Sequence, residues 1–271
     1  HSFGERLVRQ ALQEDGYFAL SNNIARELAE AGAPPERIWR ARNFLDHMPP
    51  SPPPPPEKPV FLTLGRFHEV KNLPFLVKAF DAAAREHGEM RLKLVGGGSD
   101  ELNVRMAADK AGAKDRIDIQ NWTNFPTKEY RTATAHVSVS KTEGLSNVLV
   151  EAVACGTPII STDVSGVRDV IDPENALPEE VPSGGYLRGK GGLIVGHDDL
   201  EGTKRALLNM ATDAEMRAEL SAEARARAEK AYTEEAAIAE MESACRAIIE
   251  GGESTAEERG FPRSIFRELA S

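Results

Sequence analysis

The most constraining feature of this 271-residue sequence is a regular alternation of short apolar runs and longer helical patterns that begins at residue 60. Short apolar runs at 60–64, 91–95, 116–119, 136–140, 158–161 and 192–195 predict strands. Helical patterns at 73–86, 100–111, 127–132, 147–155 and 198–211 follow individual strands. Parallel strands need such helical crossovers, so the alternation predicts an α/β domain with a doubly wound parallel sheet, that is, a Rossmann-like fold. Residues 213–248 predict one or two amphipathic helices, and 173–190 a loop or insertion.

Composition excludes several classes of protein. A hydrophobic content of 41% and a charged content of 28% are ordinary for a soluble globular protein. A net charge of −10 argues against non-specific nucleic-acid binding, and no apolar run approaches the roughly 20 residues of a membrane span. Cys155 and Cys245 lie too far apart to suggest a metal site. So few cysteines fit a reducing compartment, which predicts a cytoplasmic location.

The first 59 residues predict a separate unit followed by a spacer. Helices are expected at 5–15 and from Ser21 to Gly32, and strands at 17–20 and 36–41. Residues 49–59 read P-P-S-P-P-P-P-P-E-K-P, which favours an extended polyproline conformation. We interpret this run as a stiff spacer between domains, with a ligand for an SH3-type domain as the alternative.

Two glutamates eight positions apart stand across a loop-to-helix junction. Ser146 or Asn147 can cap a helix that ends at Gly156. Glu143 then lies just before a helix N-terminus, which suits an anionic phosphate. Glu151 lies inside a largely apolar helix, where a charge is costly without a partner. The pattern favours a ligand with phosphate and hydroxyl groups; two ordinary surface glutamates are the alternative.

Two cations follow the first strand of the alternating region. Gly65 and Arg66 end that strand, and Lys71 comes five residues later. Ligands of doubly wound sheets bind beyond the carboxyl ends of the strands, where these cations could neutralise a diphosphate. Two solvated surface side chains are the alternative. Glycines 96–98 predict a tight turn near this edge, and Trp122 is either close to a nucleotide base or a core aromatic.

Two of these segments resemble a known signature. The run E-G-L-S-N-V-L-V-E-A-V-A-C-G-T-P-I-I-S-T-D at 143–163 resembles the donor site of the retaining glycosyltransferases of family 4, which have the GT-B fold. So does L-G-R-F-H-E-V-K-N at 64–72, although Asn72 stands where the family often has glycine. The resemblance covers roughly residues 17–248. It implies that the chain contains the C-terminal, donor-binding lobe of a GT-B fold.

The resemblance also implies roles for individual residues. Glu143 would contact the hydroxyls of the donor sugar, and the backbone near the start of the helix would approach the sugar and the phosphates. Glu151 would accept hydrogen bonds from the ribose. Arg66 and Lys71, with Gly65 allowing close approach, would stabilise the leaving diphosphate. The implied catalytic residues are Glu143, Arg66 and Lys71, and the implied substrate-binding residues are Gly65, Gly144, Leu145, Ser146, Asn147 and Glu151.

The resemblance implies a reaction and its partners. The sequence contains no Asp-x-Asp, so no metal and no other cofactor is expected. The donor would be a nucleotide diphosphate sugar, with UDP favoured, and the acceptor a glycan or a lipid-linked glycan. The sugar would be transferred to an acceptor hydroxyl with retention of configuration. No nucleic-acid partner is expected.

The expected organisation places residues 1–48 at the end of an N-terminal, acceptor-side lobe, 49–59 in the linker, 60–250 in the donor domain and 251–271 in a weakly ordered tail. Most of the N-terminal lobe would be missing, so the fragment alone is expected to be inactive. Attachment to the membrane surface through that missing lobe stays open. Two alternatives also stay open: a non-catalytic nucleotide-sugar-binding lobe, and a nucleotide-sugar epimerase of the same fold.

Overall fold

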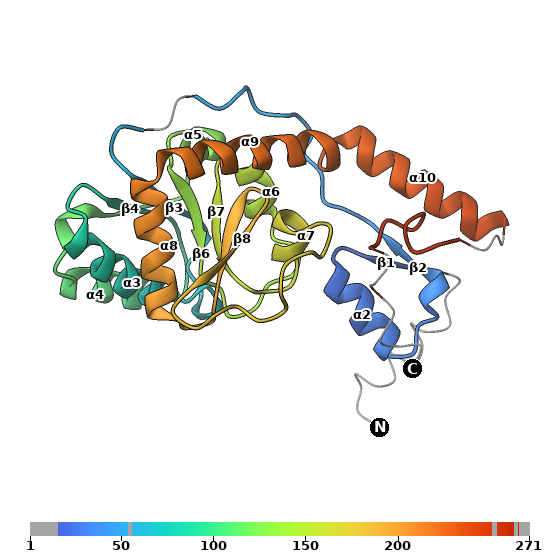
Figure 1. Cartoon of the computed structure of the whole chain (residues 1–271), viewed down its shortest axis with the longest axis horizontal. Coiled ribbons are helices and arrows are strands. Elements are labelled where there is room, and N and C mark those ends of the chain that lie inside the picture. Colours follow the sequence, from blue (N-terminus) through green and yellow to red (C-terminus); the bar gives the residue numbers. More distant parts are fainter. Residues whose placement is uncertain (1–15, 54–55, 251–253, 263–264, 266–271) are drawn as a thin grey trace.

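The computed structural model of the chain describes residues 16–53, 56–250, 254–262 and 265. These residues form two units, and a seven-stranded sheet lies at the centre of the larger one (Figure 1). The strands are β3 (Val60–Arg66), β4 (Arg91–Gly97), β5 (Ile117–Gln120), β6 (Ala135–Ser138), β7 (Ile159–Thr162), β8 (Tyr186–Gly189) and β9 (Gly192–Val195). Their order is β5-β4-β3-β6-β7-β9-β8, and all described pairs are parallel except β8–β9. The predicted doubly wound α/β sheet is confirmed; the helix expected at 5–15 lies outside the described residues.

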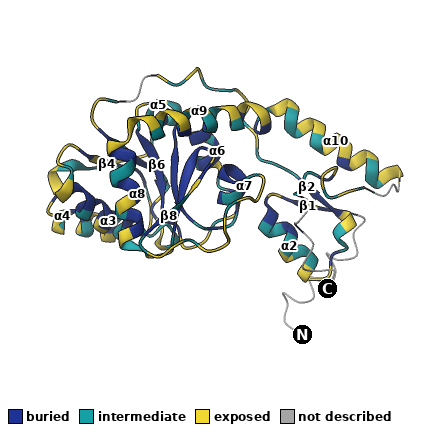
Figure 2. Cartoon of the chain, viewed as in Figure 1, coloured by how far each residue is buried: buried dark blue, intermediate teal, exposed yellow. Residues whose placement is uncertain are grey.

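Helices cover both faces of this sheet. They are α3 (Leu73–Glu86), α4 (Glu101–Lys110), α5 (Pro126–Arg131), α6 (Asn147–Ala154), α7 (Val167–Ile171), α8 (Leu200–Thr212) and α9 (Ala214–Ala231). Successive strand residues point to opposite faces, so Phe61 joins the core beneath α3 and α8, whereas Leu62 joins the core beneath α6 and α9. Figure 2 shows the resulting concentration of buried residues in the strands. Burial on both faces explains why the central strands have apolar residues at successive positions, such as Phe61 and Leu62 of β3.

Two elements of the sheet region differ from the sequence prediction. β8 lies in the segment 173–190, for which we expected only a loop or insertion, and it pairs antiparallel with β9. Its four residues, Y-L-R-G, are half-exposed at the sheet edge and carry no apolar run. The five-residue helix α7 is too short to show a helical period.

A second, smaller unit is formed by residues near the N-terminus. β1 (Tyr17–Ala19) pairs in parallel with β2 (Ile38–Arg40), with α2 (Asn22–Glu30) and the short 3-10 helix η1 (Pro35–Arg37) between them. The predicted helix start is confirmed, because the Ser21 hydroxyl accepts a hydrogen bond from the backbone N–H of Ile24. Of the tail expected after residue 250, the structure describes residues 254–262 and 265, and Phe261 and Ile265 are buried in the core of this unit.

Two connections join the units. α9 lies on the large domain, and α10 (Glu234–Glu250) continues from it across to β1 and β2 (Figure 1). The described prolines of the linker run back along the domain, where Arg225 donates to the carbonyl of Pro49 and Arg131 to that of Ser51. This part of the linker is therefore held against the surface of the domain.

Candidate donor site

The carboxyl ends of β3 and β4 form an open edge. Gly65 has a φ of +144°, and a side chain there would meet no atom within 4 Å. Gly96, beside it, leaves no such space, because a Cβ would lie 1.9 Å from the carbonyl oxygen of Gly65. The tight turn predicted at glycines 96–98 is wrong in position, because Gly96 and Gly97 still belong to β4 and pair with Gly65 and Arg66, and the chain turns only after Gly98. A Cβ on Gly98 would lie 2.3 Å from the carbonyl oxygen of Phe67, so the backbones approach closely there. Arg66 is exposed and forms no ion pair with the described residues.

The short 3-10 helix η2 (Glu69–Lys71) carries Lys71 back over this edge. His68 precedes it and accepts a hydrogen bond from the backbone of Val70. Asn72 ends it in the left-handed region, with a φ of +54°. Asparagine tolerates this conformation better than most side chains, which explains how it replaces the glycine that the resemblance led us to expect. Its amide also donates to Asp198 at 2.9 Å, a contact that glycine could not make.

Glu143 and Lys71 form an ion pair, although 72 residues separate them. Glu143 lies on the loop between β6 and α6, and the Ser140 hydroxyl donates to the same carboxylate at 2.8 Å. Both charged side chains are partly shielded, with 15% of the Glu143 side chain and 22% of the Lys71 side chain exposed. The structure therefore brings the two predicted ends of the site together.

The donor loop, residues 143–147, leads into the N-terminus of α6. Gly144 is exposed, and a Cβ placed on it would meet nothing within 4 Å, whereas Leu145 is buried. Ser146 is the N-cap residue, but neither it nor Asn147 caps the helix through its side chain, so the expectation of a side-chain cap is wrong. The Leu149 N–H donates to the carbonyl of Ser146 at 3.1 Å, but no side chain among the described residues caps the first turn, so its earlier N–H groups can reach a ligand.

Glu151 finds the partner that its position requires. The Tyr130 hydroxyl donates to its carboxylate at 3.1 Å. Burial raises the pKa of Glu151, and the hydrogen bond from Tyr130 partly offsets that rise. The pKa of Tyr130 is itself raised well above its ordinary value, first by burial and then by the negative charge of Glu151.

His136 is a further polar group beneath the site. It is buried in β6, its ring meets the Tyr130 ring edge-on, and neither of its nitrogens has a partner among the described residues. Burial, assisted by the positive charge of Lys71, lowers the pKa of His136 to about 3. The ring is therefore neutral at physiological pH.

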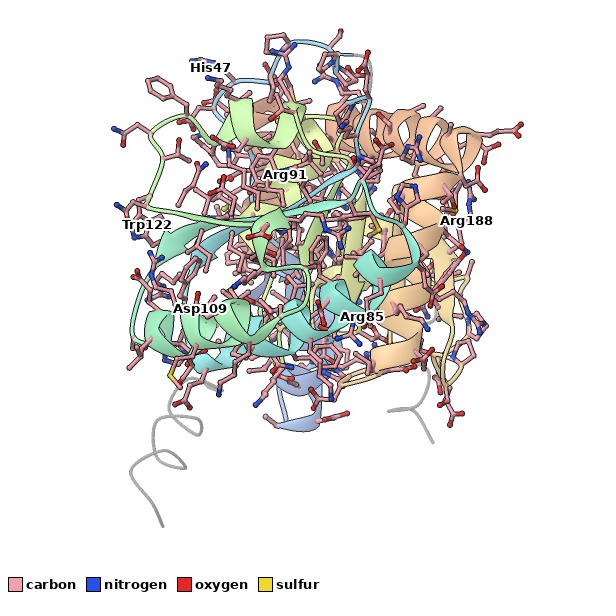
Figure 3. All side chains as sticks on the ribbon, turned by 90° about the vertical axis from the view of Figure 1, so that its left-hand side faces the viewer. His47, Arg85, Arg91, Asp109, Trp122 and Arg188 are labelled. Atoms are coloured by element: carbon pink, nitrogen blue, oxygen red, sulfur yellow. The ribbon has the colours of Figure 1, made fainter. Side chains whose placement is uncertain are left out.

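Trp122 lies close to the same edge. It is 57% exposed, so the alternative of a core aromatic is wrong (Figure 3). Its indole nitrogen would be 3.6 Å from a Cβ placed on Gly97 at the end of β4. An exposed aromatic ring beside a strand end can stack on a planar ligand.

Two contacts to the donor loop could not be read from the sequence. The Asn43 amide, from the segment after β2, donates to the carbonyl of Leu145 at 3.2 Å and to the side chain of Asn147 at 2.6 Å. Gly166 packs under the loop, and a Cβ there would lie 2.7 Å from the carbonyl oxygen of Gly144. For Gly166, the sequence contains one indication of such a contact: the glycine follows the strand after α6, where a close backbone approach can require glycine.

Neither a metal cluster nor a membrane span occurs in the described part of the chain. Its residues contain no group of three or more histidine, cysteine, aspartate or glutamate side chains arranged to hold a metal ion. None of the described helices is both long and apolar enough to cross a membrane. A cavity of about 280 Å³ lies at the opposite, amino-terminal edge of the sheet, lined by Pro52, Tyr130, Cys155 and Pro158 among others, and none of the predicted site residues lines it.

Comparison with known proteins identifies relatives. A lipopolysaccharide 1,6-galactosyltransferase of Salmonella typhimurium is 35% identical over 130 residues, which are 45% of this chain and 35% of that protein. A lipopolysaccharide core biosynthesis glycosyltransferase of Rhizobium meliloti, LpsE, is 29% identical over 165 residues, or 61% of this chain and 43% of that protein. The chain spans less than half of the length of these relatives.

Solved structures share the fold. A mutant of Staphylococcus aureus TarM, crystallised with fondaparinux, α-GlcNAc-glycerol and UDP, superposes with a TM-score of 0.75 at 16% identity, over 89% of this chain and 46% of that one. The expected GT-B lobe is thereby confirmed as the fold of the larger unit. The family model described as "Glycosyl transferases group 1" matches residues 46–227, which is more than half of the chain. The chain belongs to the group 1 glycosyl transferases.

Proposed function

We propose that the chain is the donor-binding part of a retaining glycosyltransferase of family 4, which transfers a sugar from a UDP-sugar to an acceptor hydroxyl. One observation carries this proposal. Lys71 and Glu143 meet at the carboxyl edge of the sheet, beside exposed Arg66 and the uncapped N-terminus of α6. At this edge, cations and backbone N–H groups can bind a diphosphate, and the neighbouring carboxylate can accept hydrogen bonds from sugar hydroxyls.

The cations and the helix N-terminus act on the diphosphate. Arg66 has no competing ion pair among the described residues and can offer its planar fork to the phosphate oxygens. Lys71 has three donors, so it can keep Glu143 while it binds a second oxygen. Negative charge grows on the diphosphate as the glycosidic bond breaks, and fixed positive groups stabilise that charge most in the transition state.

The glutamates act on different parts of the donor. Glu143, oriented by Lys71 and Ser140, accepts hydrogen bonds from the sugar hydroxyls. Glu151 accepts hydrogen bonds from the ribose and keeps the one from Tyr130, because a carboxylate has about four acceptor sites. No side chain serves as a nucleophile. The acceptor hydroxyl attacks from the face that the diphosphate leaves, and the leaving phosphate takes its proton, which retains the configuration.

The proposed chemistry is independent of metal. Arg66, Lys71 and the first turn of α6 supply the positive charge that Mg²⁺ would otherwise provide. Transfer by the full-length enzyme is therefore expected to persist in excess EDTA. Loss of transfer on chelation that Mg²⁺ or Mn²⁺ restores would contradict this part of the proposal.

The relatives support the choice of donor and acceptor. Two of them are named for lipopolysaccharide synthesis, and the solved structure of TarM contains UDP. We propose a glycan or lipid-linked glycan as the acceptor. We further propose a cytoplasmic enzyme that approaches the membrane surface through a preceding acceptor-side lobe, to which residues 1–48 would belong.

Calorimetry with UDP tests the site directly. Arg66→Ala and Lys71→Ala should each weaken UDP binding by about tenfold to a hundredfold, because a hydrogen bond to a charged group contributes roughly 1.5–3 kcal/mol. Lys78→Ala, on the exposed side of α3, is the charge-matched control and should bind UDP like the wild type. Wild-type affinity in both site variants would remove the diphosphate from this edge.

A non-catalytic nucleotide-sugar-binding lobe is the second candidate function. All the residues proposed to contact the donor lie between Gly65 and Glu151, so this region would bind UDP without an acceptor-side lobe. Such a lobe would bind UDP with the same dependence on Arg66 and Lys71. Transfer assays with and without an added acceptor-side lobe distinguish the two, because only the transferase gains activity.

A further inference from the structure

Asn43 reaches the donor loop from outside the donor domain. It follows β2 by three residues, and its amide donates at 3.2 Å to the carbonyl of Leu145 and at 2.6 Å to the side chain of Asn147. The contacts span 102 and 104 residues of sequence. The small N-terminal unit therefore touches the loop that the proposed function assigns to the donor.

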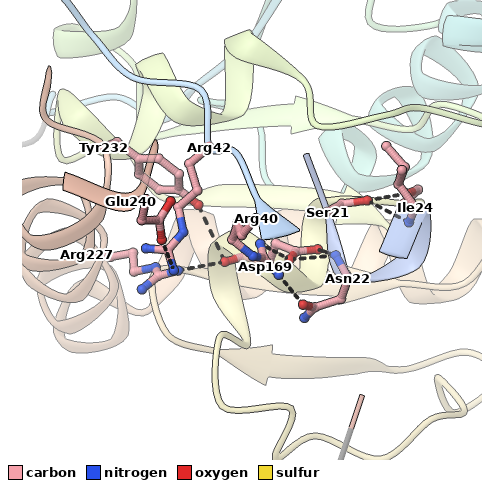
Figure 4. Close-up of polar contacts among 10 residues, drawn as sticks. Ser21, Asn22, Ile24, Arg40, Arg42, Asp169, Arg227, Tyr232 and Glu240 are labelled. Atoms are coloured by element: carbon pink, nitrogen blue, oxygen red, sulfur yellow. Dashed lines mark hydrogen bonds and ion pairs between the residues drawn. The ribbon is translucent and has the colours of Figure 1, made fainter. Parts of the chain in front are cut away.

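The segment that carries Asn43 is fixed at two other points (Figure 4). Arg40 forms a buried ion pair of 2.6 Å with Asp169 of α7, and both side chains are about 5% exposed or less. Arg42 pairs at 2.9 Å with Glu240 of α10. Because the segment is anchored to two helices, the Asn43 amide has little freedom to move. The two hydrogen bonds from this amide therefore restrain the donor loop.

The same anchor supports the loop from below. Gly166, the residue before α7, packs so closely that a Cβ would lie 2.8 Å from the Cα of Leu145. The Ser165 hydroxyl next to it lies 3.2 Å from the hydroxyl of Ser21 in the small unit. The turn before α7 and the segment after β2 thus enclose the donor loop from two sides.

The restraint on Leu145 has a consequence for its neighbour. A trans peptide unit is planar, with its C=O and N–H pointing in opposite directions. When Asn43 holds the carbonyl of Leu145, it fixes the direction of the Ser146 N–H as well. That N–H belongs to the group that the proposed function directs at the donor.

Resting on that proposed function, we propose that Asn43 is a positioning residue for donor binding. It aims the Ser146 N–H and holds Asn147 at the N-terminus of α6, so donor affinity depends on a side chain that comes from outside the donor domain. Asn43 itself contacts no donor atom in this proposal.

Amide exchange and calorimetry on the full chain test the proposal together. Asn43→Ala removes both hydrogen bonds, and Asn43→Leu removes them while keeping the volume. Asn23→Ala is the matched control, because Asn23 lies in the same unit and bonds only to Glu27 among the described side chains. Hydrogen–deuterium exchange is followed by mass spectrometry in peptides that cover residues 143–147 and 60–66, and UDP affinity is measured for each variant.

Both Asn43 variants should exchange faster at 143–147 and at the wild-type rate at 60–66. UDP affinity should fall about three- to tenfold, because the Ser146 N–H is no longer held toward the donor and one hydrogen bond contributes roughly 0.5–1.5 kcal/mol. The control should match the wild type in both measurements. The proposal is overturned if exchange at 143–147 is unchanged in both variants. It is also overturned if the variants exchange faster only within residues 17–42 and bind UDP normally, which is the signature of a purely structural side chain.

Failure of the proposed function gives a different result. A wild-type chain that binds no UDP would contradict the donor assignment and, with it, the role of Asn43 in donor binding; faster exchange at 143–147 in the variants would then show only that Asn43 restrains the loop. A wild-type chain that binds UDP, with variants indistinguishable from it, would contradict only the role of Asn43.

Discussion

The two glutamates of the donor site differ in what surrounds them. Glu143 is paired with Lys71 at the open edge, and Glu151 lies on α6, where the Tyr130 hydroxyl donates to it. We expect separate functional effects, because Glu151 would bind the ribose, which both the UDP-sugar and UDP contain, whereas Glu143 would bind the sugar, which UDP lacks.

Glutamine substitutions should reveal this difference. Glu151→Gln should weaken UDP and UDP-sugar alike by about tenfold, while the carbonyl oxygen of the new amide still accepts the Tyr130 hydrogen bond. Glu143→Gln should leave UDP affinity nearly unchanged and lower kcat/KM by roughly tenfold to a hundredfold, since its contacts strengthen in the transition state. Calorimetry and initial rates of the full-length enzyme measure the two effects. Normal binding and normal rates in both variants would refute the site.

Buried His136 makes the fold sensitive to acid. Its pKa is about 3 in the folded chain and 6.5 ordinarily, so between these values the unfolded chain binds more protons. The contribution of His136 to stability is complete above pH 6.5 and is lost as the pH falls, at up to about 1.4 kcal/mol per pH unit.

Replacement of the ring tests this titration. His136→Phe keeps an aromatic ring against Tyr130 and cannot be protonated. Its free energy of unfolding in urea should therefore decrease less steeply than that of the wild type between about pH 6.5 and pH 4. Parallel pH profiles for the two proteins would show that His136 is not the group responsible.

Among the elements, the turn before α7 packs directly against the donor loop. Gly166 has a φ of +84°, and a Cβ would meet the carbonyl oxygen of Gly144 at 2.7 Å. Gly166→Ala should therefore lower the free energy of unfolding by more than the roughly 1–2 kcal/mol of a left-handed alanine, and it should weaken UDP binding.

A second glycine separates steric contact from backbone strain. Gly184 has a similar φ of +66°, but a Cβ there would meet only Glu201, at 3.8 Å. Gly184→Ala should show the conformational cost alone and bind UDP normally. Equal effects of the two substitutions on UDP affinity would mean that the contact with the loop is unimportant.

The elements also show how far sequence patterns reach. Strands such as β3 and β7 were predictable because burial on both faces gives them successive apolar residues, such as Phe61 and Leu62 in β3 and Ile159 and Ile160 in β7. The edge strand β8 was not, since half-exposed residues carry no such pattern. In the site, Glu143 and Lys71 were identified from local motifs. Asn43 acts through a contact more than 100 residues away, and nothing in its local sequence indicates that contact.

At the scale of the whole molecule, the buried pair of Arg40 and Asp169 joins the two units. Both carboxylate oxygens of Asp169 also accept one bifurcated hydrogen bond from the backbone N–H of Asn22, and its backbone carbonyl accepts one from Arg227 (Figure 4). Because the pair is almost fully buried, removal of one charge leaves the other without compensation.

Substitution of this aspartate should loosen the junction. Asp169→Asn should lower the free energy of unfolding by roughly 3–5 kcal/mol. Glu174→Gln is the control; it breaks an exposed pair with Lys190 and should cost about 1 kcal/mol or less. Urea unfolding followed by circular dichroism measures both. Equal losses of unfolding free energy in the two variants would show that the buried pair between the units contributes no more to stability than a surface pair.

The core of the small unit unites the two ends of the described chain, because Tyr17, Ala19 and Ile38 pack with Phe261 and Ile265. Synthesis proceeds from the N-terminus, so the first strand emerges from the ribosome long before its packing partners exist. The large domain, whose residues are contiguous, can fold while the chain is still growing. The small unit must wait until these distant partners have been made, so the junction that holds Asn43 against the donor loop is completed later than the donor domain itself.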